Sequence, residues 1–208
     1  MNTFSHFLAT LVLTLLAPHL LAASETQLSA TGNITPSACL IGLSANGVID
    51  HGRIPASSLK RDEFTVMPGQ LMVLEVNCSA PLLFTLVGLD GREDSSLAPD
   101  FFYGLGKNPH APDERLGSVA LSFRNPLGDG QPMLSLTTYN NGTSWSPEPN
   151  IYPRHWMGFA RPGRPLPEPI IHLVTTLRVD TSISPANNLS LKQEVPLDGA
   201  IVLDLRYL

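Results

Sequence analysis

The residues after Ala200 constrain the fold most, because they alternate in polarity up to the last position of the chain. One side of the extended chain carries four apolar or aromatic residues: Ile201, Leu203, Leu205 and Tyr207. A period of two over this length predicts a half-buried β-strand. Chain ends tend to lose order unless they are tied down, so a closing strand of this kind is expected to lie within a sheet.

Strand patterns recur along the rest of the chain. Alternation is clear in four segments, residues 70–78, 118–124, 133–139 and 170–180, and weaker in three others, residues 28–35, 48–54 and 189–195. In the segment 170–180, Ile171, Leu173 and Leu177 are expected to face the core. Residues 82–89 are apolar on both faces, which predicts a central strand. Residues 101–106 fit either a strand or a loop.

The whole chain shows roughly nine to eleven strand patterns and no helix pattern. This predicts an all-β protein with an immunoglobulin-like β-sandwich. Composition agrees, because only 15% of the residues are charged and the chain holds 19 Pro and 16 Gly.

The N-terminus predicts export. Residues 7–17 form an apolar run that is too short to span a bilayer, and small residues follow it. We therefore expect a signal peptide over residues 1–23 and a single domain over residues 24–208, with an uncleaved anchor as the less favoured alternative. No later apolar run has the length of a membrane helix, so an integral membrane protein is not expected. The net charge of −5 argues against nucleic acid as a partner.

Two cysteines, Cys39 and Cys78, are present. In an exported chain an even count predicts a disulfide, and two free buried thiols are the less favoured alternative.

Motifs for catalysis are lacking in the sequence. The histidines have no neighbours at metal-ligand spacing, and no nucleophile elbow or phosphate-binding glycine loop occurs. Asp50 and His51 are adjacent, and adjacent residues of a strand face opposite ways. No enzymatic activity, metal or cofactor is expected.

Residues 147–169 contain seven prolines together with aromatic and arginine side chains. Because proline donates no backbone hydrogen bond, this stretch predicts a long loop folded over the sandwich. Aromatic and arginine residues are also favoured at interfaces, so a ligand-contact surface is the second interpretation. Its candidate residues are Tyr152, Arg154, Trp156 and Arg161.

Three short motifs occur in order along the chain: Gly32-Asn-Ile-Thr-Pro-Ser-Ala-Cys39, Cys78 at the end of a strand, and the penultimate Tyr207. Taken together, they resemble the pilins of the bacterial chaperone–usher pathway. Four further segments are Val48-Ile-Asp-His-Gly-Arg-Ile54, Phe102-Tyr-Gly-Leu-Gly106, Leu191-Lys-Gln-Glu-Val-Pro-Leu-Asp-Gly199 and Leu205-Arg-Tyr-Leu208. With them the chain resembles, more specifically, the DUF1120 family of fimbrial-like exported proteins.

The resemblance implies a sandwich that lacks its last strand and receives one from another chain. The expected partners are a periplasmic chaperone, an outer-membrane usher and neighbouring pilus subunits, and the expected location is a fimbria or the periplasm. Ile201, Leu203, Leu205 and Tyr207 would then line the acceptor groove. Leu28, Ala30, Gly32 and Ile34 would belong to a donated segment or to the first strand.

Two features depart from the pilin pattern. Val195 stands where pilins often carry a glycine, and about nine residues precede Gly32 after cleavage. So short a segment is expected to donate a strand poorly, which fits a tip or orphan subunit as well as a shaft subunit. A pilus-tip adhesin or a free periplasmic binding protein that uses residues 147–169 is the alternative function.

Overall fold

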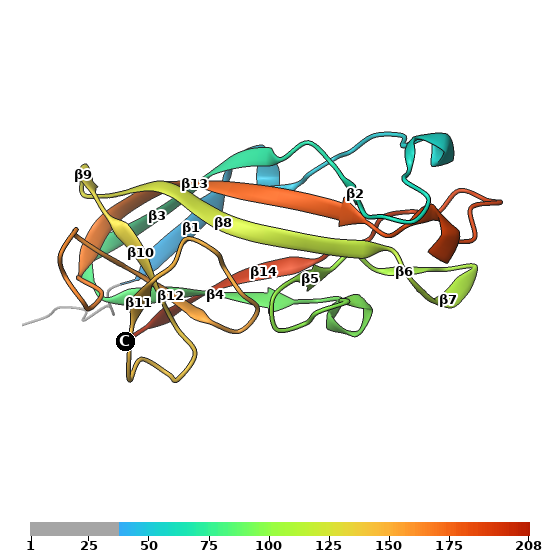
Figure 1. Ribbon diagram of the computed structural model, residues 1–208. Coiled ribbons are helices and arrows are strands. Elements are labelled where there is room, and N and C mark those ends of the chain that lie inside the picture. The colour runs from blue at the N-terminus through green and yellow to red at the C-terminus, as the bar shows by residue number, and fades with distance from the viewer. Residues whose placement is uncertain (1–37) are drawn as a thin grey trace, which may run out of the picture. The chain divides into compact units, whose positions relative to one another are not determined.

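The computed structural model describes residues 38–208, in which two antiparallel sheets face each other (Figure 1). The first sheet has the strand order β1 (Cys39–Leu43), β3 (Gln70–Leu82), β13 (Ile170–Ile183), β8 (Gly117–Gly128), β5 (Tyr103–Gly104). Two short strands extend it: β2 (Thr65–Val66) pairs with β13, and β9 (Gln131–Pro132) pairs with β8.

The second sheet has the order β11 (Ser146–Pro147), β10 (Leu134–Thr138), β12 (Trp156–Ala160), β4 (Phe84–Asp90), β14 (Ile201–Tyr207). A separate hairpin joins β6 (Lys107–Asn108) to β7 (Ala111–Arg115). The helical turns are all 3₁₀: η1 (Ser44–Gly47), η2 (Ala56–Ser58), η3 (Glu93–Ser95), η4 (Ala186–Asn188). The predicted all-β sandwich is therefore confirmed.

The core fills the space between the two sheets. Along β3 the buried positions are every second residue, Met72, Leu74 and Val76, as the sequence alternation predicts. Phe123 on β8 meets Phe159 on β12 across the layers, with ring centroids 5.3 Å apart. The core is thus built from the inward faces of both sheets, and each fully buried side chain of this size contributes about 1.5–3 kcal/mol.

A buried tyrosine ties the short strand β5 to the second sheet. The Tyr103 hydroxyl donates a hydrogen bond to the Ile151 carbonyl oxygen at 2.9 Å, and burial raises the pKa of this phenol. The ring lies over Gly88 of β4, where an added Cβ would come within 1.9 Å of the hydroxyl oxygen. Position 88 therefore has to be glycine for the tyrosine to be accommodated.

One predicted facing is wrong at the start of β13. Ile171 is 43% exposed, and Ile170 is buried in its place, because the register with β3 shifts between Ile170 and His172. The carboxylate of Asp129 accepts hydrogen bonds from the backbone of Ile171 and His172 at this bulge. The register shift interrupts the alternation, so the pattern holds only from Leu173 onward.

Two other predictions over short segments are also wrong. The loop expected over residues 147–169 is interrupted by β12, which lies between β10 and β4 and is largely buried. No proline falls within Trp156–Ala160, so the ladder is complete there. Conversely, residues 48–54 and 189–195 form no strands, although Ile49, Ile54 and Val195 pack against the core. Their alternation reflects core packing by extended chain without a hydrogen-bonded neighbour.

The other clear strand predictions agree with the structure, and residues 101–106 contain the short strand β5. The predicted signal peptide, residues 1–23, and the residues Leu28, Ala30, Gly32 and Ile34 lie outside the described residues.

Candidate functional site

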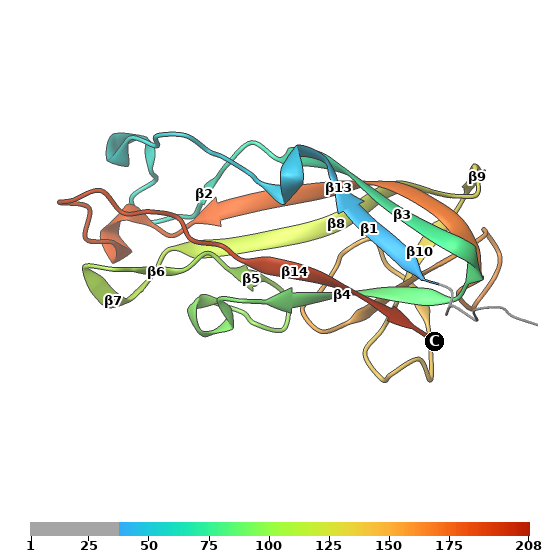
Figure 2. The ribbon, with the colours of Figure 1, turned by 180° about the vertical axis from the view of Figure 1, so that it is seen from behind.

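The two sheets leave one side of the sandwich without a closing strand. There β1 pairs only with β3, and β14 pairs only with β4, and Figure 2 shows β1 and β14 on the same side of the sandwich. Within residues 38–208 no strand lies between them. One hydrogen bond connects the two edges, from the Cys39 amide to the Tyr207 hydroxyl oxygen at 2.8 Å.

A hollow of about 200 Å³ opens between these edges and reaches the core. Its walls include Leu43 on the β1 side and Ile201 and Leu203 of β14. Its floor includes Met72 and Leu177 of the first sheet, which belong to the hydrophobic core. Core side chains therefore form the floor of a hollow that opens between the two strand edges.

A second hollow of about 540 Å³ continues the first past the N-terminal end of β14. The two hollows share Ile49, His51 and Leu197. It lies between the extended segments 49–54 and 189–197, and its lining is more polar, with Asp50, His51, Arg53, Gln193 and Glu194. We call the two hollows together the edge groove.

A local turn explains why the segment 48–54 does not continue the first sheet. Gly52 has φ +62°, and its amide donates to the side chain of Asp50 at 2.7 Å. This Asx-type turn redirects the chain, while the His51 imidazole lies 3.0 Å from the Thr181 hydroxyl of β13. The backbone beside the groove thus stays extended without a partner strand.

The disulfide fixes the β1 wall of the groove. Cys39 and Cys78 occupy opposed positions of β1 and β3, and the structure joins them, as the sequence predicts. Because β1 is an edge strand of five residues, this covalent bond anchors it at the end nearest Tyr207.

The residues expected to line the groove from the closing strand divide into two groups. Ile201, Leu203 and Leu205 are half-buried and pack against the core. Tyr207 is 51% exposed and serves through its hydroxyl as the acceptor for Cys39. On the opposite face of β14, Val202 is 59% exposed. Sequence reasoning missed Leu105, His51 and Leu197, although all three lie within motifs that carry the family resemblance.

The four residues considered for a ligand-contact loop each contact different neighbours. Tyr152 packs edge-on against Phe101, with centroids 5.9 Å apart, and Arg154 forms ion pairs with Glu93 and Asp100. Trp156 begins β12. Arg161 follows the end of β12 and pairs with Glu168 at 2.8 Å.

The imidazole of His155 contacts one of these four residues. His155 is stacked edge-on against Tyr152, with ring centroids 5.4 Å apart. Burial, helped by the positive charge of Arg154, lowers the pKa of His155 below its ordinary value.

The side chains of residues 38–208 include no group of three or more His, Cys, Asp or Glu residues placed to hold a metal ion. In the same part of the chain, none of the helices has the length and apolarity needed to cross a membrane.

The fold and the groove define an all-β sandwich with an open edge between β1 and β14. In comparisons with known proteins, residues 28–117, somewhat less than half of the chain, match a family model described as "Protein of unknown function (DUF1120)". The matched span covers β1, the segment 48–54 and the Tyr103–Gly104 strand, which all contribute to the groove or its support. No curated protein matches the chain.

Proposed function

We propose that this protein is a structural subunit of a surface fimbria, with an incomplete immunoglobulin-like domain that is completed by a strand from another chain. The observation that carries the proposal is the edge groove, where core residues such as Met72 and Leu177 form the floor of a hollow between two unpaired strand edges. The motif resemblance to chaperone–usher pilins supports the same assignment.

The physical argument is that such an edge favours strand addition. The unpaired backbone groups of β1 and β14 can bond to an incoming strand, and its alternate side chains can fill the hollow. An open apolar edge left without such a strand promotes aggregation, so natural proteins cover it. The strand would lie antiparallel to β14 or parallel to it, with its apolar side chains directed toward Leu203 and Leu177.

In this proposal, a periplasmic chaperone first supplies the strand, the usher accepts the complex, and a neighbouring subunit then takes the place of the chaperone. Export through the predicted signal peptide, residues 1–23, and the Cys39–Cys78 disulfide agree with this route, because disulfides persist in oxidising compartments.

The test is to supply the strand in cis. A ten-residue segment with Ile and Val at alternate positions is fused after Leu208 through a Gly-Ser turn, and unfolding of the fused and unfused mature chains (residues 24–208) is compared. We expect the fusion to raise the unfolding midpoint and to reduce aggregation. The control fusion carries Asp at the same alternate positions.

A pair of matched variants locates the effect. Leu203→Glu places a charge in the groove, whereas Val202→Glu places it on the exposed face of the same strand. The fused strand should stabilise the Val202→Glu protein and fail to stabilise the Leu203→Glu protein. A mature chain that is a stable monomer alone, and gains nothing from either fusion, contradicts the proposal.

The alternative, ligand contact through the whole of residues 147–169, has less support. Tyr152 precedes β12 and Arg161 follows it, so these two residues flank a buried strand and do not share one loop.

A further inference from the structure

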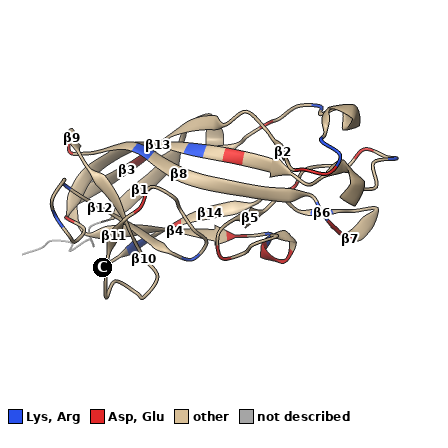
Figure 3. Ribbon diagram, in the orientation of Figure 1, with Lys and Arg blue, Asp and Glu red and all other residues tan. Residues whose placement is uncertain are grey.

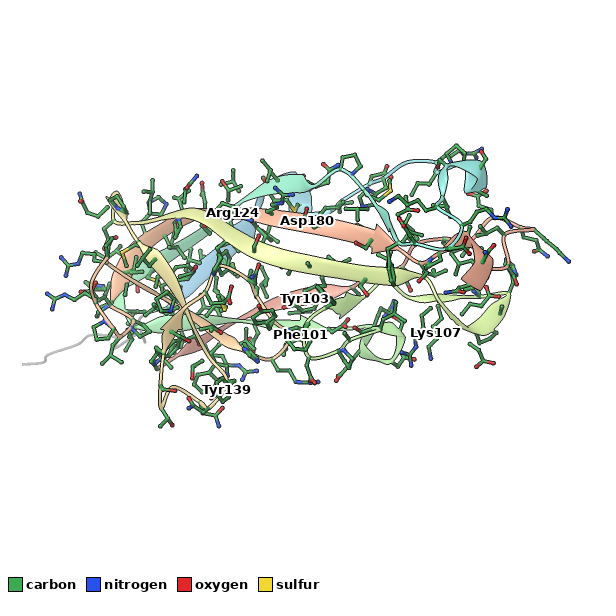
Figure 4. The ribbon with its side chains drawn as sticks, viewed as in Figure 1. Phe101, Tyr103, Lys107, Arg124, Tyr139 and Asp180 are labelled. Carbon is green, nitrogen blue, oxygen red and sulfur yellow. A yellow bond between two sulfur atoms is a disulfide. The ribbon has the colours of Figure 1, made fainter. Side chains whose placement is uncertain are left out.

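A separate cavity lies beside β8 and β5, at the edge of the first sheet opposite the edge groove. A cavity of about 280 Å³ is lined there by Phe101, Phe102 and Tyr152, with Asn150 at one side. Figure 4 labels Phe101, which lies two residues before the buried Tyr103 and is itself 58% exposed. We call this hollow the aromatic pocket.

The aromatic rings that line this pocket are inclined to one another and do not lie in one plane. Phe101 and Tyr152 meet at an interplanar angle of 90°, and Phe102, which is 42% exposed, lines the cavity with them. Rings at right angles offer a ligand both a face and an edge, and an aromatic face carries partial negative charge.

Carboxylates outnumber cations around this pocket. Arg154 is shared by two carboxylates, Glu93 and Asp100, and Asp100 directly precedes Phe101. A third carboxylate, Glu148, accepts hydrogen bonds from the amide and the side chain of Asn150. Its other oxygen lies 3.5 Å from the Tyr152 hydroxyl, which places it at the rim of the pocket.

The surplus negative charge is local. Glu148 forms no salt bridge with any residue of the range 38–208. Figure 3 shows the acidic residues gathered on the loop after β4, which contains Glu93 and Asp100. The three carboxylates and the single guanidinium of Arg154 leave the surroundings of the pocket with a net charge of about −2.

We propose that the aromatic pocket binds a quaternary ammonium group, held over the rings of Phe101 and Tyr152 and attracted by the carboxylate of Glu148. Aromatic faces recognise weakly hydrated organic cations in this way. The charge surplus favours a cation over a neutral sugar or an apolar side chain. A compact primary ammonium holds its water more strongly, so an apolar wall suits it less.

The proposal is independent of strand addition, because Phe101, Tyr152 and Glu148 do not line the edge groove. A negative result for cation binding therefore does not test strand addition, and the converse also holds.

The test is a titration of the mature protein, followed by NMR or calorimetry, with choline and with its neutral isostere 3,3-dimethylbutan-1-ol. We expect saturable choline binding and an affinity for the alcohol that is about tenfold weaker, since only the cation gains from the rings and the carboxylate. Methyl glucoside is the third probe and should not bind.

Variants assign the site. Tyr152→Leu and Phe101→Leu keep apolar volume and remove a ring, and each should weaken choline binding about tenfold. Glu148→Gln keeps the shape of the side chain and removes its charge, and it should weaken binding several-fold. The matched control is Tyr139→Leu, which removes a 78% exposed ring that does not line the pocket, and it should leave binding unchanged.

Three results would overturn the proposal. They are equal binding of choline and the neutral alcohol, absence of saturable choline binding by the folded protein, and unchanged choline affinity in the Glu148→Gln and Tyr152→Leu variants. Binding of methyl glucoside in place of choline would also reject it and assign the pocket to carbohydrate.

Discussion

Removal of the disulfide should destabilise the protein by an amount that follows from the length of chain it closes. Cys39 and Cys78 are 39 positions apart. In the chain-entropy treatment, a loop of this length restricts the unfolded state by about 13 cal/mol/K, which corresponds to about 4 kcal/mol at 25 °C. We expect the loss of stability to affect β1 most, because without the disulfide this five-residue edge strand is held by its pairing with β3.

The measurement is urea unfolding of the mature protein and of the double variant Cys39→Ser/Cys78→Ser, which leaves no unpaired thiol. With a urea dependence of about 2–3 kcal/mol/M, the midpoint should fall by about 1.3–2 M. The wild-type protein treated with a reductant provides the control, and its midpoint should match that of the double variant.

The reasoning is refuted if the midpoint of the double variant falls by less than about 0.5 M with an unchanged urea dependence. Such a result would mean that β1 contributes little to the cooperative unit, and the edge groove would then lack one of its fixed walls.

Two further predictions concern packing and pH. Gly88→Ala should lower the free energy of unfolding by at least about 2 kcal/mol, because the new methyl group would overlap the Tyr103 hydroxyl. Adding Tyr103→Phe should recover part of this loss, and simple additivity in a double-mutant cycle by urea unfolding would contradict the clash. Hydrogen bonds from Arg161, first from its side chain, lower the pKa of Glu168 from 4.5 to about 2. Because the folded pKa is the lower one, this carboxylate stabilises the fold above pH 4.5, and its contribution is lost as the pH falls toward 2. Glu168→Gln should therefore flatten the stability profile between these pH values, and an unaltered slope would count against the ion pair.

The fold was predictable where one face of a strand meets the core and the register is regular. Met72, Leu74 and Val76 alternate in sequence and in burial, and the position of Cys78 follows from the same period. At Ile171 the pattern failed because the register between β13 and β3 shifts there, where Asp129 accepts a hydrogen bond from the Ile171 amide. Periodicity carries no information on such a bulge, which depends on a side chain from a distant turn.

The strand β12 shows a second limit. The prolines on both sides of Trp156–Ala160 suggested a loop, yet five proline-free residues suffice for a buried strand that Met157 and Phe159 anchor in the core. The segment 48–54 shows the converse, since Ile49 and Ile54 pack inward although the turn at Gly52 keeps the backbone out of the ladder.

The candidate site was predictable in part. The inward face of the closing strand was evident from Ile201 and Leu203, because the alternation specifies which side chains share a face. The aromatic pocket was not, since Phe101 and Tyr152 are far apart in sequence and only the tertiary fold brings their rings into contact.

The place of β4 in the second sheet has a consequence for the time course of folding. Its neighbours are β12 and β14, and β14 begins 111 residues after β4 ends. A chain that becomes available N-terminus first therefore leaves this apolar strand without its last partner until nearly all of its residues are present. Pairing of such high contact order is slow in itself. Until β14 pairs with it, β4 presents an unpaired apolar edge, which promotes aggregation.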